Sequence, residues 1–503
     1  MPDDSHLSWA ELTDFSPGLW TTSPYLIPAS GAAVMEDCRP EIGGGIRAAM
    51  KATSFATTGL SSTGQVCGIY SRGAIVHQSL PTSASDRYIA LYDSADYKIK
   101  IYRWNETLTS APTSWTLVIA HDAPSSHAKP NPVQFDTFVD SAGDTHVIWN
   151  IAYASTSADG IWSLKFTYQA GGSSPAATQR KGGFFPNALA VQDDRIIAGS
   201  NATLFWSDSQ SVSSWSVANN LPVQASRQGM IITSITPFAP SDLLIGASNA
   251  PWTMVQGDIT DPVVRSMSDA RPTGWAQKVP MTTQGLAFVA PGTSVVLSSN
   301  GATFRDISTQ IDPATWGHSY SKNGDVGGGE CAFLGNFLVA PHGLIYDFRT
   351  QAWFTLSGLT TSADHFHSTA VTAGDIRQLF CATGDDGSDL DLWLFDASED
   401  TRAASYTWKS APLRNPDGRQ IRLRSVEIYA TAFDSGSTIA VTVGSTTYTR
   451  TLTNGVNQHL RYIFAEQAEE LDVQVEAASA SASVEAPSIE VIRIGTRPGH
   501  LNR

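Results

Sequence analysis

One tetrapeptide of the chain carries side chains that could hold a transition metal. Asp364-His365-Phe366-His367 places two imidazoles two positions apart, so both would lie on one face of an extended strand. Asp364 would point to the opposite face, and no third ligand is identifiable nearby. A zinc site needs three or four ligands. An ordinary strand therefore explains this stretch better than a metal site.

The stretch GDDGSDLD offers carboxylate oxygens, the ligands that calcium prefers. Its four acidic residues are Asp385, Asp386, Asp389 and Asp391. Their spacing does not complete a calcium-binding loop, and Gly and Asp are typical turn residues. We predict a polar turn here, and we assign no metal or cofactor to the chain.

The usual signatures of catalysis are absent from the sequence. We find no GxSxG, no GxxxxGK[ST], no HExxH and no strand-linked GxGxxG. SDSQSVSSW at 207–215 approaches the Asp-box turn of sialidases but lacks its glycine and its spacing. A glycosidase needs two facing carboxylates, and no such pair can be identified from the sequence. We predict no catalytic residues and a protein that is not an enzyme.

Five segments repeat a short pattern of an aliphatic run, a tight turn and an aromatic strand. DDRIIAGSNATLFW at 193–206 matches PSDLLIGASNAPWTM at 240–254 with a constant offset of 48 residues. Related segments lie at 294–304, 336–348 and 391–396. A period of about 40–50 residues built from short strands indicates a β-propeller. We expect roughly six to eight blades.

Composition supports an all-β protein and argues against tight binding of nucleic acid. Hydrophobic residues make up 42% of the 503 residues and charged residues 16%, with 40 Gly and 26 Pro. The formal net charge is −15, and the Lys and Arg residues are scattered rather than clustered. The four cysteines form no CxxC pair, which favours buried thiols. The sequence contains no apolar run of about 18 residues and therefore predicts no membrane span. The N-terminus does not resemble a signal peptide.

The residue patterns along the sequence divide the chain into three parts. Residues 1–45 are aromatic but lack a regular period, which predicts an irregular N-terminal arm. Residues 46–410 carry the β-propeller, and residues 411–503 alternate strictly, as in a C-terminal β-sandwich with a polar tail. The arm either packs on its own propeller or contacts a neighbouring subunit. Its candidate assembly contacts are Trp9, Phe15, Leu19, Trp20 and Tyr25.

Three phrases near the N-terminus resemble the first residues of tail proteins from short-tailed bacteriophages. They are Asp14 to Leu19, Ile27 to Ala32 and Gly43 to Arg47, with Pro17 in place of the more usual glycine. The later repeats and the alternating C-terminal part also resemble the tail nozzle, or tail tube, proteins of these phages. Such proteins combine a propeller with smaller β-domains.

This resemblance implies a structural virion protein, present as a homohexameric ring in the tail below the portal and adaptor. Its implied partners are further copies of itself, the head-to-tail adaptor protein and tail fibre or spike proteins. Double-stranded DNA would pass through the ring during ejection without tight binding, which an acidic lumen would favour. The implied location is the virion tail, assembled in the cytoplasm of the bacterial host.

Two other functions compete with the structural one. A propeller at the tail surface could bind a host glycan by stacking exposed tryptophans on sugar rings. A polysaccharide-degrading hydrolase would need two acidic residues facing each other in the axial cleft. Binding or cleavage of host polysaccharide by the purified protein would distinguish these functions from the ring.

Overall fold

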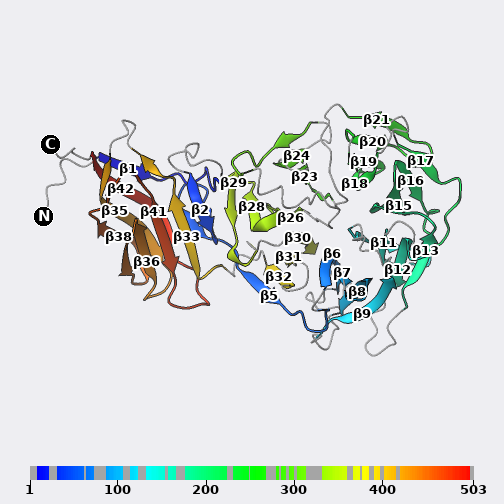
Figure 1. The fold of residues 1–503 in the computed structure, drawn as a ribbon, viewed down its shortest axis with the longest axis horizontal. Helices are drawn as coiled ribbons and strands as arrows, with labels where there is room; N and C mark the ends of the chain where they lie inside the picture. The colour runs from blue at the N-terminus through cyan, green and yellow to red at the C-terminus, as the bar shows by residue number, and fades with distance from the viewer. Residues whose placement is uncertain are drawn as a thin grey trace.

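The regular secondary structure of the described residues consists almost entirely of β-strands (Figure 1). The computed structural model describes residues 8–21, 31–61, 64–72, 86–93, 95–105, 114–122, 132–152, 157–165, 176–223, 230–248, 250–267, 279–282, 285–290, 294–298, 303–312, 331–359, 366–373, 376–383, 390–396, 402–414 and 420–498. The helical segments Pro341–Gly343 and Ser357–Leu359 are single 3₁₀ turns. Across the described ranges, no helix has the length and apolar character needed to cross a bilayer. The predicted all-β class is confirmed.

Small antiparallel sheets follow one another around a ring, which confirms the predicted β-propeller (Figure 1). Among the described residues, six of these sheets have four strands each. The first contains β6 (Gly64–Arg72), β7 (Asp86–Asp93), β8 (Lys98–Asn105) and β9 (Thr116–Asp122). The second contains β10 (Phe135–Val139), β11 (Thr145–Ile151), β12 (Gly160–Lys165) and β13 (Thr178–Gly182).

The next three sheets contain most of the sequence repeats. They are β14 (Ala188–Gln192), β15 (Arg195–Ser200), β16 (Thr203–Trp206) and β17 (Asn220–Pro222), then β18 (Ile232–Ala239), β19 (Asp242–Ala247), β20 (Thr253–Gln256) and β21 (Val263–Ser266). The third of them has β22 (Met281–Thr282), β23 (Gly285–Ala290), β24 (Ser294–Ser298) and β25 (Arg305–Asp306). A further group of four, β26 (Ala332–Leu334), β27 (Phe337–Val339), β28 (Leu344–Asp347) and β29 (Ala352–Thr355), belongs to a larger sheet.

The last sheet of the ring joins distant parts of the chain. Its strands are β30 (Phe366–Ala373), β31 (Ile376–Thr383), β32 (Asp391–Asp396) and β5 (Ala52–Phe55). β5 pairs antiparallel with β32, so an early strand completes a sheet whose other strands come late in the sequence. The innermost strands β30 and β6 also pack together, which closes the ring.

The middle strands of several sheets are buried along almost their whole length because neighbouring sheets cover both of their faces. β23 is buried at every position, and β15 and β19 are buried after their first residue. Polar side chains also connect adjacent sheets. Gln134 Oε1 accepts from the Leu189 amide at 2.8 Å, and Gln192 Nε2 donates to the Asp242 carbonyl at 3.0 Å. These buried bonds fix how one sheet sits on the next.

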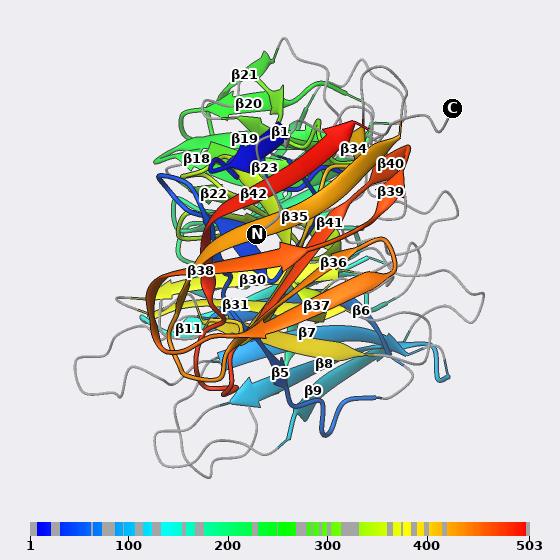
Figure 2. The same ribbon diagram turned by 90° about the vertical axis from the view of Figure 1, so that its left-hand side faces the viewer.

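Strands from both ends of the chain form a second body beside the ring, here called the terminal unit (Figures 1 and 2). One of its sheets contains β1 (Ser8–Leu12), β3 (Cys38–Pro40), β4 (Ile46–Ala48), β35 (Ile421–Ala432), β38 (Gly455–Ile463), β39 (Gln467–Ala468) and β42 (Ser488–Pro498). The other contains β2 (Ala32–Glu36), β33 (Ser405–Ser410), β36 (Thr438–Val443), β37 (Thr446–Thr451) and β41 (Val473–Ala478). A short pair, β34 (Leu413–Arg414) and β40 (Glu470–Leu471), completes the unit.

The two sheets of the terminal unit share one apolar core. Alternate residues of β35 are buried, and Ile428 lies in the same cluster as Val441 of β36 and Val475 of β41. The Tyr462 hydroxyl donates to the Ile439 carbonyl at 2.8 Å and so bonds β38 of one sheet to β36 of the other. The strict alternation of the C-terminal sequence is the pattern that a half-buried sheet requires.

The structure corrects the expected irregular arm at residues 1–45. Within the described part of that segment, Ser8–Leu12, Ala32–Glu36 and Cys38–Pro40 are strands. β1 pairs with β42, and β2 pairs with β33, so this segment belongs to the terminal unit. The error arose because the partner strands lie more than 370 residues away in the sequence. A lone strand of five residues carries too few positions to show a period.

The boundary expected at residue 410 also shifts. β33 (Ser405–Ser410) already pairs with β2 and β41 of the terminal unit. Of the four cysteines, Cys38, Cys67 and Cys331 are buried, and the side chain of Cys381 lies outside the described residues. Burial raises the pKa of the Cys38 and Cys67 thiols, which keeps them protonated and unreactive.

Candidate functional site

The ring and the terminal unit are joined through a continuous sheet. Its strands run in the order β26-β27-β28-β29-β2-β33-β41-β36-β37, so the four-stranded group of the ring continues directly into the terminal unit. β2 and β29 meet through the parallel bridge of Glu36 and Thr355. We call this place the junction, and the backbone amides of Leu19 and Trp20 bond to its strands β29 and β2.

The predicted assembly contacts divide into two groups in the structure. Phe15 and Leu19 are buried within the chain, at 1% and 3% exposure, so their side chains cannot contact a neighbouring subunit. That part of the prediction is wrong, because both residues belong to the core of their own chain. Trp20 is half-buried. Trp9 lies on β1 opposite Gly495, but its side chain is outside the described residues, as is all of Tyr25.

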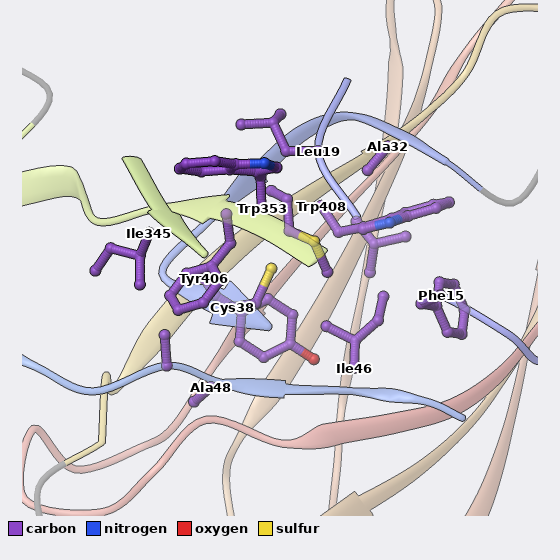
Figure 3. Close-up of a cluster of buried hydrophobic side chains, with 14 of the residues drawn as sticks. Phe15, Leu19, Ala32, Cys38, Ile46, Ala48, Ile345, Trp353, Tyr406 and Trp408 are labelled. Carbon is purple, nitrogen blue, oxygen red and sulfur yellow. The ribbon is translucent and has the colours of Figure 1, made fainter. Parts of the chain in front are cut away.

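Phe15 packs against the terminal unit. Its ring meets the indole of Trp408 edge-on, with 5.7 Å between ring centroids and 90° between planes. Trp408 lies on β33 and is fully buried (Figure 3). Edge-to-face packing is a favoured aromatic geometry, and it adds to the apolar area that both rings bury.

Leu19 connects the same segment to the ring. Its amide donates to the Trp353 carbonyl of β29 at 2.8 Å. The Trp20 amide donates to the Ala32 carbonyl of β2 at 2.8 Å, and the Trp353 indole donates to the Ile307 carbonyl at 2.8 Å. Leu19, Trp353 and Trp408 lie close together in the close-up of the core (Figure 3). The phrase Asp14 to Leu19 is therefore a structural link between ring and terminal unit.

The phrase Gly43 to Arg47 forms the turn between β3 and β4 and the beginning of β4. Gly43, Gly44 and Gly45 have φ of 95°, 102° and 89°, which disfavours other residues there. The Glu41 amide donates to the Gly45 carbonyl at 3.2 Å, and the Gly44 amide donates to the Glu41 carbonyl at 3.2 Å. Of the third phrase, the structure describes only Gly31 and Ala32 at its end.

A network of arginine and carboxylate side chains borders the junction. Arg39 Nη1 lies 3.3 Å from Asp347 Oδ2, and Arg349 binds both oxygens of Asp347, at 3.1 Å through Nε and 2.8 Å through Nη2. Arg47 binds both oxygens of Glu485, at 3.1 and 2.7 Å. Asp347 is completely buried. Burial raises the pKa of Asp347 to about 6, and the positive charge of Arg39 offsets only part of that rise.

The raised pKa of Asp347 predicts how stability depends on pH. The folded protein holds a proton on Asp347 between pH 3.8 and about 6, where the unfolded chain has released it. The contribution of Asp347 to the free energy of unfolding is therefore largest at low pH and is lost as the pH rises through this window. We expect the free energy of unfolding of the wild type, minus that of Asp347→Asn, to decrease from pH 4 to pH 6 in urea titrations. A rise over this window would mean that the arginines dominate and hold the pKa low.

The candidate metal ligands are only partly described. Asp364, His365, Asp385, Asp386 and Asp389 lie outside the described residues. The backbone of His367 is in β30, and Asp391 is exposed at the start of β32. Within the part of the chain that the structure describes, no group of three or more His, Cys, Asp or Glu side chains could hold a metal ion.

The stretch at 207–215 forms a turn that follows β16. The carboxylate of Asp208 accepts from Asn219 Nδ2 at 2.8 Å and from the Ser214 hydroxyl. These hydrogen bonds lower the pKa of Asp208. The carboxylate therefore stabilises its own loop.

The arginine network was not found by sequence reasoning. Arg39 and Asp347 lie 308 positions apart, and Arg47 and Glu485 lie 438 positions apart. The only local signal was the Gly-Gly-x-Arg phrase, which fixes Arg47 directly after the turn. No other feature of the sequence brings these residues together.

Comparisons with known proteins identify no family. No protein-family model and no curated protein matches the chain. Similar solved structures include an exo-β-1,3-galactanase from Phanerochaete chrysosporium with galactose, at 9% identity and a TM-score of 0.29 over 88% of this chain and 100% of that one. YCF48 bound to D1 peptide is similar at 11% identity and a TM-score of 0.39, over 70% and 97% of the two chains. At these TM-scores the likeness to the two structures is loose, and no function follows from it.

Proposed function

We propose that this protein is a structural subunit of the tail nozzle of a short-tailed bacteriophage, present as a hexameric ring through which the genome leaves the virion. One observation carries the proposal. Of the phrases that resemble tail proteins, Asp14 to Leu19 bonds to β29 of the propeller and packs on β33 of the terminal unit, and Arg47, at the end of Gly43 to Arg47, lines a cavity together with Arg349. A subunit of a hexamer needs a propeller and a terminal unit held in one fixed arrangement. The segment that resembles tail proteins holds these two bodies together.

The architecture also supports the proposal. Tail nozzle proteins combine a propeller with smaller β-domains, and this chain combines a propeller with a two-sheet unit, which we take to be a β-sandwich. We assign seven blades to the propeller, from the six four-stranded sheets and the group β26–β29. The net charge of −15 suits a lumen that repels the phosphate backbone and lets DNA slide.

This function places the protein in the virion tail, after assembly in the host cytoplasm, next to the head-to-tail adaptor and to tail fibres or spikes. It requires no catalytic residue. The mass of the purified protein tests it, measured alone and with isolated portal–adaptor complexes. A ring that forms alone or on that template would support the proposal. A monomer that ignores the complex and binds or cleaves host polysaccharide would contradict it and favour a glycan-directed propeller.

The half-buried Trp20 provides a variant that separates assembly from folding. Its indole donates to the Pro17 carbonyl at 3.0 Å within one turn. We expect Trp20→Ala to cost about 1 kcal/mol of stability, since only part of the side chain is buried, but to reduce ring formation clearly. The matched variant Phe15→Ala should cost about 3–5 kcal/mol, because Phe15 is in the core. Thermal unfolding and mass measurements of both variants give the comparison. If the two variants lose the same stability and Trp20→Ala assembles like the wild type, Trp20 is not an assembly contact.

A further inference from the structure

Two edge strands, β37 and β38, lie on one side of the terminal unit, here called the open side (Figure 2). β37 ends the sheet that continues from the propeller, and β38 ends the other sheet of the unit. The Tyr448 ring of β37 meets the ring of Phe464, directly after β38, with 5.2 Å between ring centroids. Both sheets of the unit therefore stop at the same side.

The outer edge of β37 carries backbone groups that no described strand binds. β37 pairs with β36 in one continuous register, and the amide of Leu452, directly after β37, donates to the Ser437 carbonyl at 2.7 Å. Amides alternate in direction along an antiparallel strand, so those of Thr447, Thr449 and Thr451 point away from β36. Within the described part of the chain, β36 is the only strand that pairs with β37. Such a row of unpaired groups is a template for a further strand.

β37 lacks most of the features that keep edge strands apart. Its sequence, TTYTRT, contains no proline, its register with β36 has no bulge, and its single charge is Arg450. Thr and Tyr are residues that favour strands. Every residue of β37 after Thr446 is exposed. The edge is therefore regular, six residues long and accessible to another chain.

The open side also exposes apolar surface. Four large hydrophobic side chains in the described part of the terminal unit are exposed, and three of them lie on β37 and β38: Tyr448 at 46%, Val456 at 72% and Ile463 at 62%. Tyr448 lies opposite Val441, on the face of β37 that belongs to the core. A half-exposed tyrosine on that face shows that the core is uncovered at this edge. An added strand would cover it.

The charge of the open side restricts the kind of strand that fits. Residues 446–463 contain Arg450, His459 and Arg461 but no Asp or Glu. Arg461 and His459 lie 3.6 and 3.5 Å from Glu427 of the neighbouring strand, whereas Arg450 is exposed and forms no ion pair with a described residue. Opposite charges on facing strands stabilise a sheet, so a carboxylate opposite Arg450 is the best match.

We propose that β37 pairs with an extended, acidic strand of a second copy of this chain. All 47 acidic residues lie outside residues 446–463, so another copy supplies carboxylates, but the same edge of that copy does not. The contact is therefore head-to-tail, between the open side and a different surface of the neighbour. The added strand binds the outward amides of β37 and covers Tyr448.

A head-to-tail contact can repeat from copy to copy and close into a cyclic assembly. The inference rests on the function proposed above, to which it adds the surface that joins neighbouring subunits of the hexamer.

Hydrogen exchange of the full-length protein locates the contact. Exchange is measured on dilute protein and on protein assembled alone or on isolated portal–adaptor complexes. We expect the amides of residues 446–452 to exchange at least about tenfold more slowly after assembly, because the outward amides gain partners. The exposed outer strand β21 of the propeller is the internal reference and should change less than about twofold. Unchanged exchange at 446–452 in assembled protein would overturn the inference.

A proline variant tests the backbone pairing. Thr449→Pro removes one outward amide and leaves the bonds to β36 in place, since proline is tolerated on an edge strand where its nitrogen faces solvent. It should weaken association between copies about tenfold, the effect of losing one buried hydrogen bond. Thr449→Ala keeps the amide and is the matched control, with an expected change of less than about twofold.

A charge variant tests the acidic partner. Arg450→Glu should weaken association about tenfold, because it places like charges on facing strands. The control is Arg265→Glu on β21, which is also an exposed edge strand. It should change association by less than about twofold, because solvent screens a distant charge.

Sedimentation measures the association of each variant, and circular dichroism checks folding. If Thr449→Pro does not fold, Arg450→Glu and its control decide. Hexamers that form equally well in Arg450→Glu and the wild type would overturn the inference and leave the proposed function standing. Association that these variants weaken, but that builds no hexamer on the portal–adaptor complex, would support the inference and contradict the function. A wild type that stays monomeric with and without that complex would overturn both.

Discussion

Replacing Trp408 by alanine should destabilise the protein by about 3–5 kcal/mol, the range for truncating a fully buried large aromatic side chain. Trp408 has no exposed surface, and it contacts Phe15 from the segment that links ring and terminal unit. The cavity left behind would loosen the contact between β33 and that segment. We therefore expect the terminal unit of this variant to unfold before the ring, as two transitions in urea.

Two controls make this prediction specific. Trp408→Phe should cost much less, because it retains a ring, and the Trp408 indole N–H has no hydrogen-bond partner among the described residues. Trp252→Ala removes an equally buried tryptophan from a core cluster within the ring. It should lower stability by a similar amount without loosening the junction. If Trp408→Ala and Trp252→Ala show the same number of transitions, the Phe15–Trp408 contact does not couple the two bodies.

The second large effect is expected at Gly44, in the turn between β3 and β4. A Cβ at this position would lie 2.2 Å from the Thr13 carbonyl oxygen, a backbone atom that cannot turn away. Gly44→Ala must therefore displace the segment between β1 and Phe15. We expect a loss of about 3 kcal/mol or more, as the sum of backbone strain and this clash. Under the function proposed above, formation of the hexamer should also decrease, because the displaced segment leads to Trp20.

Gly43 provides a matched control for the strain alone. Its φ of 95° is close to the 102° of Gly44, but a Cβ on Gly43 would meet nothing within 4 Å. Gly43→Ala should cost about 1–2 kcal/mol, the usual penalty for a side chain at positive φ. Urea unfolding of the two variants gives the difference. Equal losses would show that the Thr13 carbonyl moves aside easily and that the turn does not fix the linking segment.

The ring could be predicted from the sequence because propeller sheets are local. The repeats at 193–206 and 240–254 become β15–β16 and β19–β20 of two successive sheets, and Ile197 and Ile245, 48 residues apart, occupy the same apolar cluster. Each of these sheets forms from strands close in sequence, so the periodicity survives in the chain. The alternation of β35 likewise predicted a sheet with one buried face.

The terminal unit and the site beside it could not be predicted in the same way. Ser8 pairs with Thr496, and Ala32 pairs with Ser410, so neither early strand has a partner near it in the sequence. Phe15 and Leu19 were recognised as apolar residues that must be covered, but the sequence does not show which surface covers them. The arginine network combines side chains near residues 39, 47, 347 and 485, and no short segment of the sequence contains more than part of it.

The pairing of β5 with β32 imposes an order on folding during synthesis. β5 and its partner lie about 340 residues apart, so β5 waits on the order of tens of seconds for β32 to leave the ribosome. β1 waits still longer for β42. During that interval the inner sheets of the ring can fold one after another, while the early strands remain unpaired. The nascent chain therefore cannot complete either the propeller or the terminal unit until these late strands have been made.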